Sequence, residues 1–275
     1  MSELKVKSIF YYPVKSCAGT ELQEAQIGLR GIINDRLFMI TDESGSALTQ
    51  REEPKLALIK PHFENNILYL NAPGFDKIKI DKPESGSQRL VTIWGDTCIA
   101  LDQGEKRAEW LSNYLHRACR LVYMKPDFQR KLNPEYAISE KDNVGFADGY
   151  PFLLIAQESL DGLNTRLDTP VPMDRFRPNI VIEGCNSFEE DSWQRIKINS
   201  IQFEVVKPCI RCIIPTIDQK SLKKTKEPLA TLTTFRHLSG KGILFGQNLI
   251  QHSIGQISVG DQLTVLERKK PFFSD

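Results

Sequence analysis

Two cysteines, Cys209 and Cys212, are separated by two residues in the stretch VKPCIRCIIPTID, and Arg211 directly precedes the second cysteine. A thiolate can bind a metal ion or act as a nucleophile, and a neighbouring guanidinium favours the thiolate and attracts anions. The stretch is therefore compatible with a zinc site, a redox couple, a catalytic nucleophile, or a ligand for something larger and negatively charged.

The surroundings of the cysteine pair argue against two of these alternatives. A structural zinc site needs four ligands, usually from two such pairs, whereas this chain has one pair and four scattered histidines. A thioredoxin-like couple lies at the start of a helix, whereas Cys212 is followed by the extended, proline-containing run IIPTID. Two ordinary packed thiols remain an alternative, because cysteine also behaves as a small apolar residue.

Basic and polar residues beside expected strands indicate a phosphate-bearing ligand. A single residue of this kind is usually a solvated surface group. Several together are what a phosphate requires, because Arg binds it through two parallel hydrogen bonds and Lys adds a compact charge. Their spacing along the chain does not show that they converge. The residues are Lys15-Ser16, Arg36, Thr49-Gln50-Arg51, and Arg175, Arg177 and Asn179.

Short β-strands dominate the elements that must position these residues. Runs such as RLFMITDE and RLVTIWG are rich in β-branched and aromatic residues and lie between turns containing Gly, Pro, Asn or Asp. The alternation in IKINSIQFEVV predicts a hairpin with its turn at Asn199-Ser200. The segment QISVGDQLTVLE predicts a second hairpin, with its turn at Gly260-Asp261.

Helical patterns are fewer. Apolar residues at helical spacing predict a helix over 102–116, with Asp102 as its N-cap, and a second helix over 157–167. The polar segment 125–151 is predicted to be a linker or a long active-site loop. Many short strands with few helices indicate an α+β fold that is predominantly β, with a barrel-type architecture.

The bulk composition is that of an ordinary soluble globular protein. The net charge is +1, from 36 basic and 35 acidic residues that are mixed along the chain, so no nucleic-acid partner is expected. No apolar run approaches the roughly 20 residues needed to span a bilayer. The N-terminus lacks the patterns of secretory and transit peptides, and we expect a cytoplasmic protein without a membrane partner. Six irregularly spaced cysteines are too few for a disulfide scaffold.

Several segments together resemble a known family, the MOSC-domain proteins with their N-terminal companion domain. The resemblance is to the branch that contains the mitochondrial amidoxime-reducing component and bacterial hydroxylaminopurine-detoxifying proteins. It implies a β-rich N-terminal domain over 1–122, packed on a MOSC-type β-barrel with a few helices over 123–275. The segments, in order through nearly the whole chain, are YPVKSCAG (12–19), NDRLFMIT (34–41), LTQREEPKLALI (48–59), FADGYPFLLIAQESLDGLN (146–164), RFRPNIVIEG (175–184), DSWQRIKI (191–198), KPCIRC (207–212), KEPLATLTTFR (226–236) and LFGQNLI (244–250).

The resemblance implies a molybdenum cofactor, Mo-molybdopterin, whose metal is bound by one protein cysteine, and the matching residue is Cys212. A soft thiolate suits such a metal. Asp148, Thr49 and Arg51 are weaker candidates, Cys209 is expected to be a bystander, and Cys185 a packed thiol. The residues that match cofactor contacts of the family are Lys15, Ser16, Arg36, Gly149, Tyr150, Arg177, Asn179 and Arg211.

Two of these positions depart from the family pattern. Gly149 and Tyr150 stand where the animal proteins have hydroxyl side chains. A backbone contact would survive that change, whereas a side-chain contact at Gly149 would not.

The resemblance implies a molybdenum-cofactor oxidoreductase that reduces N-hydroxylated compounds, such as hydroxylamines, amidoximes and N-hydroxylated bases, and so serves in detoxification. The chain contains no C-x4-C-x2-C motif, so we expect no iron–sulfur cluster in it. A separate ferredoxin, flavodoxin or cytochrome is then expected to supply electrons. Pyridoxal phosphate is not expected, because the sulfurtransferase portion of some relatives is missing. The alternative function is a carrier that delivers the molybdenum cofactor or sulfur without turnover of its own.

Overall fold

The computed structural model describes residues 3–65, 67–81 and 86–273. Strands form most of the regular structure in these ranges, and the α-helices are α1 (Glu105–Leu115), α2 (Gln157–Asn164) and α3 (Leu229–Arg236). The prediction of an α+β fold that is predominantly β is thereby confirmed. No helix in the described ranges is both long and apolar enough to cross a membrane.

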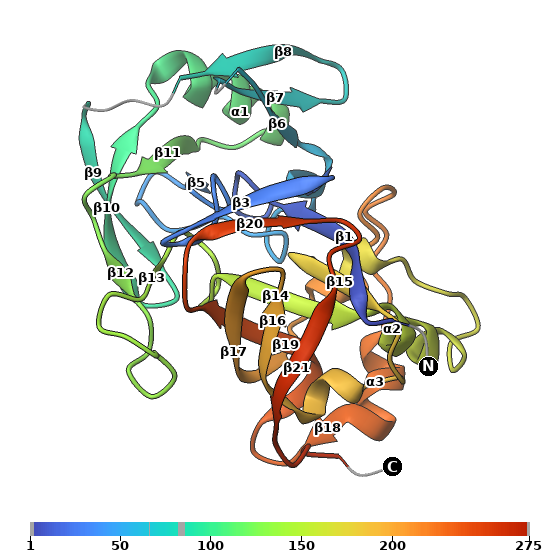
Figure 1. Ribbon diagram of the computed structural model, residues 1–275. Helices are drawn as coiled ribbons and strands as arrows, with labels where there is room; N and C mark the ends of the chain where they lie inside the picture. The colour runs from blue at the N-terminus through green and yellow to red at the C-terminus, as the bar shows by residue number, and fades with distance from the viewer. Residues whose placement is uncertain (1–2, 66, 82–85, 274–275) are drawn as a thin grey trace.

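The largest sheet forms the lower half of the molecule, where its strands curl around a common core (Figure 1). The strand order is β2-β1-β15-β14-β19-β17-β16-β21, with β18 paired to β19. Most neighbours are antiparallel, but β14 and β15 are parallel. The bounds are β1 (Lys5–Tyr11), β2 (Thr20–Leu22), β14 (Phe152–Ala156), β15 (Ile180–Glu183), β16 (Trp193–Ile198), β17 (Ile201–Ile210), β18 (His237–Leu238), β19 (Gly242–Gln251) and β21 (Leu263–Arg268).

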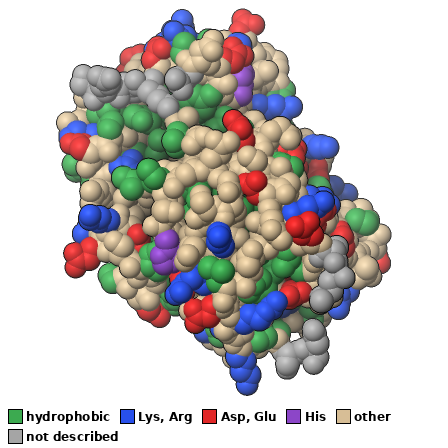
Figure 2. Space-filling model, viewed as in Figure 1, with side chains coloured by type: hydrophobic (Ala, Val, Ile, Leu, Met, Phe, Trp, Pro, Cys, Tyr) green, Lys and Arg blue, Asp and Glu red, His purple; other side chains and the backbone are tan. Residues whose placement is uncertain are grey.

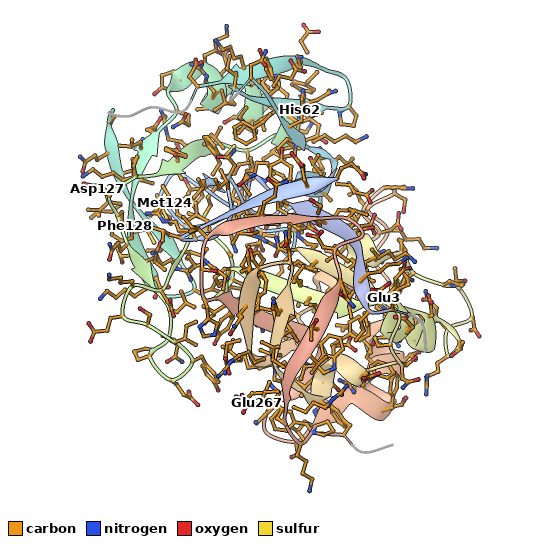
Figure 3. All side chains as sticks on the ribbon, in the orientation of Figure 1. Glu3, His62, Met124, Asp127, Phe128 and Glu267 are labelled. Carbon is orange, nitrogen blue, oxygen red and sulfur yellow. The ribbon has the colours of Figure 1, made fainter. Side chains whose placement is uncertain are left out.

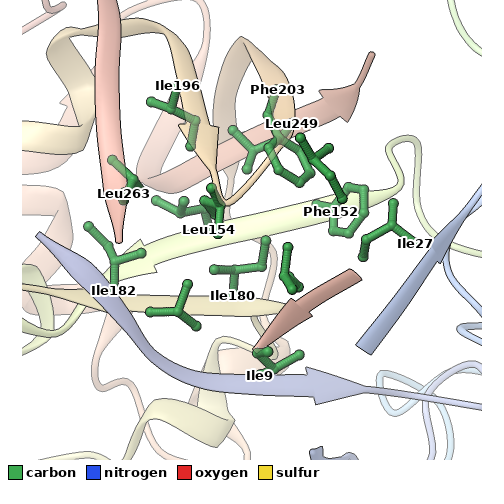
Figure 4. Packing of buried hydrophobic residues seen from close by; sticks show 14 of the residues in the cluster. Ile9, Ile27, Phe152, Leu154, Ile180, Ile182, Ile196, Phe203, Leu249 and Leu263 are labelled. Carbon is green, nitrogen blue, oxygen red and sulfur yellow. The ribbon is translucent and has the colours of Figure 1, made fainter. Parts of the chain in front are cut away.

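Alternating apolar residues give this sheet its buried face. Ile196 and Ile198 are fully buried, whereas Lys197 between them is exposed. The rings of Phe152 and Phe203 meet edge to face, with their centroids 5.3 Å apart. Each such side chain stabilises the fold by about 1.5–3 kcal/mol when it is fully buried. Figure 4 shows the side chains that converge on this core, among them Ile9, Ile27, Leu154, Ile180, Ile182, Leu249 and Leu263.

One predicted hairpin is confirmed and the other is wrong. β16 and β17 pair with Ile198 opposite Ile201, and Asn199 adopts the left-handed conformation that the tight turn requires (φ 52°). The strands around Gly260 do not pair with each other. β20 (Gly255–Ser258) pairs with β3, whereas β21 pairs with β16. A turn signal locates the end of a strand but does not select the strand's partner.

The upper half holds smaller sheets, in the orders β5-β11-β10-β9, β6-β7-β8 and β20-β3-β4, and the pair β12-β13. His62 on β6 lies at the top of this half, whereas Glu267 on β21 lies at the opposite end of the molecule (Figure 3). The bounds are β3 (Glu24–Gly28), β4 (Gly31–Ile32), β5 (Phe38–Thr41), β6 (Lys60–Glu64), β7 (Ile67–Ala72), β8 (Phe75–Ile80), β9 (Gln88–Ile93), β10 (Asp96–Asp102), β11 (Arg120–Met124), β12 (Arg130–Lys131) and β13 (Asn143–Val144).

Helix α1 begins later than predicted. Its N-cap is Gly104, in a left-handed conformation (φ 82°), and not Asp102. The Asp102 carboxylate accepts hydrogen bonds from the Gly104 amide at 2.7 Å and from Arg89 and Arg120. These ion pairs hold Asp102 at the end of β10, so the residue belongs to the strand. Helix α2 likewise ends at Asn164, before the predicted residue 167.

The strands nearest the N-terminus complete sheets that are built from the C-terminal half. β1 pairs with β15, and β3 pairs with β20. We keep the division into domains at residues 122 and 123 as a proposal about the sequence. In space the two parts are joined, because β1 and β3 of the first part pair with strands of the second. The segment 125–151 contributes β12 and β13, and its last residues, 147–150, border the cleft described next.

Candidate functional site

A cleft between the two halves is lined by segments from both. All nine residues that were predicted for the site line it: Lys15, Ser16, Arg36, Gly149, Tyr150, Arg177, Asn179, Arg211 and Cys212. The weaker candidates Thr49, Arg51 and Asp148 line it as well, as does Cys209. Cys185 lies outside the lining, where its thiol is 3.7 Å from Glu158 Oε2. The chain thus brings residues from six separate segments to one place.

Arg36 and Arg177 meet over the ring of Tyr12. Their guanidinium carbons lie 4.5 Å and 4.3 Å from the centroid of that ring. Tyr12 is buried, its hydroxyl donates to the Pro178 carbonyl at 2.9 Å, and its amide donates to Asp35 Oδ1 at 2.7 Å. Tyr12 and Asp35 were not predicted to take part. Their only signal was their position next to the segments that carry Lys15 and Arg36.

The two arginines have left-handed backbones, with φ of 49° at Arg36 and 56° at Arg177. This conformation is uncommon for residues with a side chain and persists where the surroundings hold it. Here the Arg36 amide donates to the Tyr12 carbonyl at 2.8 Å and the Arg177 amide donates to the Asp174 carbonyl at 3.3 Å, while Arg177 Nη1 donates to the Cys17 carbonyl at 2.7 Å. Strained backbones that are fixed in this way aim both guanidinium groups at the cleft.

The two arginines differ in how their charge is balanced. Burial acts to lower the pKa of Arg36, but the Asp35 carboxylate, 2.5 Å from Arg36 Nη1, outweighs it and the pKa is raised. Burial lowers the pKa of Arg177, which has no ion pair among the described residues. A buried cation without a carboxylate is costly unless an anion joins it. Arg177 is therefore suited to receive an anionic ligand.

Lys15 reaches across the cleft to Asp148, with 2.5 Å between Nζ and Oδ1. Burial lowers the pKa of Lys15 despite this carboxylate. Burial acts to raise the pKa of Asp148, but the Lys15 ammonium outweighs it and holds that pKa well below its usual range. Trp94 Nε1 also donates to Asp148 Oδ1 at 3.0 Å, and the Arg51 guanidinium lies 4.5 Å from the centroid of the Trp94 ring. Trp94 was missed, because a lone tryptophan in a hairpin turn carries no motif.

Asn179 and Ser16 shape the cleft from within the protein. Asn179 Oδ1 accepts from Arg36 Nη1 at 3.0 Å and from the Leu153 amide at 3.2 Å, and its Nδ2 donates to the Phe10 carbonyl at 3.2 Å. Its side chain therefore positions Arg36. Ser16 has a left-handed backbone (φ 65°), and its carbonyl accepts from Gln50 Nε2 at 2.7 Å.

The two cysteines differ in their contacts. Arg211 Nη1 lies 3.1 Å from Cys209 Sγ, and its Nη2 donates to the Phe176 carbonyl at 2.8 Å. The guanidinium that was expected to favour the Cys212 thiolate therefore contacts the other thiol. Burial raises the pKa of Cys209 in spite of Arg211. Cys212 follows the end of β17, is partly exposed, and receives no hydrogen bond on Sγ from a described residue. Cys212 is thus the more available ligand.

Comparison with known proteins identifies the fold. The family model described as "MOSC N-terminal beta barrel domain" matches residues 3–118, and the one described as "MOSC domain" matches residues 141–264. The chain belongs to the MOSC family. This MOSC protein is 37% identical over 275 aligned residues to mitochondrial amidoxime reducing component 2 of Rattus norvegicus, covering 93% of this chain and 81% of that one.

Two further relatives extend this comparison. Mitochondrial amidoxime-reducing component 1 of Mus musculus is 35% identical to this MOSC protein, over 95% of this chain and 82% of the relative. The molybdenum cofactor sulfurase of Danio rerio is 34% identical over 92% of this chain, but the alignment covers only 32% of that longer protein. The resemblance to MOSC-domain proteins that the sequence motifs indicated is thereby confirmed.

The cleft of this MOSC protein combines positive charge with an available thiol. Its lining includes the cations Lys15, Arg36, Arg51, Arg177 and Arg211 and a single carboxylate, Asp148, whereas the whole chain is nearly neutral. Such a lining attracts an anionic group, and Arg side chains favour phosphate. A thiolate at the same cleft can bind a soft metal ion. The arrangement therefore suits a ligand that contains both a phosphate and a metal.

Proposed function

We propose that this MOSC protein is a molybdenum-cofactor-dependent reductase of N-hydroxylated compounds, which receives electrons from a separate protein. The observation that carries the proposal is the position of Cys212, a partly exposed thiol at the same cleft as Lys15, Arg36 and Arg177. The amidoxime-reducing relatives, which are about 35% identical over most of the chain, support the same activity.

The residues present fit this cofactor. Arg211 Nε is buried and has no hydrogen-bond partner among the described residues, and Arg177 is a partly buried cation that forms no ion pair with a carboxylate of a described residue. A phosphate would offer a partner to such groups. A Cβ atom built on Gly149 would meet nothing within 4 Å, so the backbone there is open to close approach. Lys15, Ser16, Arg36, Tyr150 and Asn179 would complete the binding surface, with Cys212 as the metal ligand.

Each residue then has a defined task. Cys212 would hold the metal, because burial keeps the neighbouring Cys209 in its thiol form. Arg177 and Arg211 would neutralise the phosphate, and Asn179 would fix Arg36 through the hydrogen bond at 3.0 Å. When it is bound, the molybdenum cofactor supplies the two-electron reduction that converts the N–OH group, with two protons, to N–H and water.

Metal analysis and turnover of three proteins test the proposal. Wild type, Cys212→Ala and Cys209→Ala are purified from a cofactor-competent host, and molybdenum is measured by mass spectrometry. Loss of a residue that merely supports a ligand costs about 10–100-fold in metal affinity, so loss of the ligand should cost at least about 100-fold. We expect Cys212→Ala to lose both molybdenum and hydroxylamine reduction by reduced methyl viologen. Cys209→Ala, the matched control, should keep both.

The same experiment separates the alternative function. The match to the molybdenum cofactor sulfurase favours a carrier or delivery module as the second candidate. A carrier would retain molybdenum in the wild type but would show no viologen-driven turnover. Wild-type rates in Cys212→Ala would instead contradict the assignment of the ligand.

A further inference from the structure

A second groove borders the cleft and is lined by residues of β16, β17 and β19 and by the segment that follows β21. It has a volume of about 770 Å³. Its floor is partly apolar and includes Val205, Pro208 and Leu244, and the ring of Phe272 lies at its edge. Figure 2 shows Lys and Arg side chains over this lower part of the molecule.

Like the cleft, this groove has more positive charge than the other surface hollows. Its lining contains five cationic side chains, Lys207, Lys241, Lys269, Lys270 and Arg195, against the carboxylates Glu135 and Glu204. The hollow beside α1 contains two arginines and three glutamates, and the one around residues 166–175 and 218–231 contains three cations and three carboxylates. Among these hollows, an excess of positive charge is therefore confined to the groove and the cleft beside it, since the chain as a whole carries only +1.

The lysines of the groove also lack internal ion pairs. Among the described residues, no carboxylate pairs with Lys207, Lys241, Lys269 or Lys270, whereas Glu204 is paired with Arg195 and His252. The Lys207 ammonium lies 4.6 Å from the centroid of the Tyr136 ring, and Lys241 lies 4.1 Å from that of Phe272. Cations that rest on aromatic rings keep their charge available to a partner.

The groove and the cleft adjoin each other. Ile210 lines both, and the rings of Tyr136 in the groove and Tyr150 in the cleft are 6.1 Å apart. Ile210 and Ile213, on either side of Arg211-Cys212, are exposed apolar side chains, with 50% and 39% of their surface accessible. An apolar rim bordered by cations is typical of a surface where a protein partner docks.

We infer that this groove, from Ile213 past Ile210 to Lys241 and Lys270, docks a small acidic electron-carrier protein that presents carboxylates around an exposed redox group. The inference rests on the proposed function, because it supplies the partner from which that reaction takes its two electrons. Electron transfer weakens steeply with distance, so a docking face has to border the cleft that contains Cys212. Opposite charges on the two surfaces also raise the rate of encounter at low salt.

Charge reversal tests the docking face. The double variant Lys241→Glu/Lys270→Glu is compared with wild type and with Lys106→Glu, an exposed lysine on α1 in the other half of the molecule. The donors are a reduced plant-type ferredoxin and, separately, reduced methyl viologen, with hydroxylamine as substrate. We expect the double variant to raise the KM for ferredoxin about tenfold at low salt and to flatten its salt dependence. Turnover with viologen and the behaviour of Lys106→Glu should match wild type.

The outcomes separate the two proposals. If wild type shows no turnover with viologen, the proposed function fails, whatever ferredoxin does. If viologen turnover is intact and the double variant leaves the KM for ferredoxin unchanged, or if Lys106→Glu raises it equally, the docking face is wrong. The assignment to a protein partner also fails if the double variant loses binding to phosphatidylserine vesicles while the ferredoxin KM stays constant.

Discussion

Charged side chains are buried in two regions of this MOSC protein, and the regions balance them differently. Behind the large sheet, the buried Asp191 carboxylate accepts from Arg236 Nη2 at 2.5 Å and from Gln247 Nε2 at 2.6 Å. In the cleft, Arg177 donates only to a neutral carbonyl, and Arg211 Nε has no partner among the described residues. A buried charge that loses its partner strongly destabilises a fold, because the charge is then left uncompensated. The first region therefore serves the fold, and the cleft leaves charge for a ligand.

Breaking the ion pair between Asp191 and Arg236 should give the largest effect on stability. Asp191→Ala would leave Arg236 buried and without its carboxylate, which typically costs about 3–5 kcal/mol. We expect the free energy of unfolding in urea to fall by that amount. A double variant, Asp191→Ala/Arg236→Met, should recover part of the loss, because no charge then stays unpaired. If Asp191→Ala lowers the free energy of unfolding by less than about 1 kcal/mol, the conclusion that the Asp191–Arg236 pair stabilises the fold is wrong.

The buried Glu190, next to Asp191, makes the stability of the fold depend on pH. Burial, and next the Asp191 charge, raise the pKa of Glu190 from 4.5 to about 7. The folded protein therefore holds a proton that the unfolded chain releases. The resulting stability is fully present below pH 4.5 and is lost as the pH rises through 7.

Glu190→Gln should remove this dependence, since its side chain carries no charge at any pH. Relative to wild type, we expect the variant to gain up to about 3 kcal/mol of stability between pH 5 and pH 8. Urea unfolding at both pH values measures the difference. An identical pH dependence in the two proteins would show that Glu190 is already ionised at pH 5.

The smallest effect on stability is expected in the cleft. Arg177→Met removes a partly buried cation that has no carboxylate partner among the described residues, so the ligand-free protein should stay within about 1 kcal/mol of wild type. Thermal unfolding of the cofactor-free protein measures this. The molybdenum content after expression in a cofactor-competent host should nevertheless fall. A stability loss as large as that of Asp191→Ala would mean that Arg177 serves the fold instead.

Local patterns in the sequence predicted local structure well. The hairpin at Asn199 follows from alternation over a few residues, which fixes the buried face of both strands. The partners of β20 and β21 were predicted wrongly, because pairing with β3 and β16 depends on distant segments. Asp102 was misjudged for a similar reason, since Arg89 and Arg120 come from other strands.

The residues of the cleft were predicted from their match to family motifs. Their spacing along the chain could not show that they lie close together in the fold. Arg36 and Arg177 are far apart in the sequence and meet over the ring of Tyr12, with Asn179 also holding Arg36. Tyr12 and Trp94 act through contacts with residues of other segments, so no periodic pattern marks them. Their roles in the cleft follow only from the three-dimensional arrangement.

The pairing of β1 with β15 has a consequence for how the protein is made. Ile9 lies opposite Leu22 of β2 on one side and opposite Ile180 of β15 on the other, so one edge of β1 has no partner until β15 has been synthesised. Until then its apolar face has to be kept from aggregation, by chaperones or by speed of translation. Contacts between such distant residues also slow folding. The large sheet is therefore expected to form late in folding.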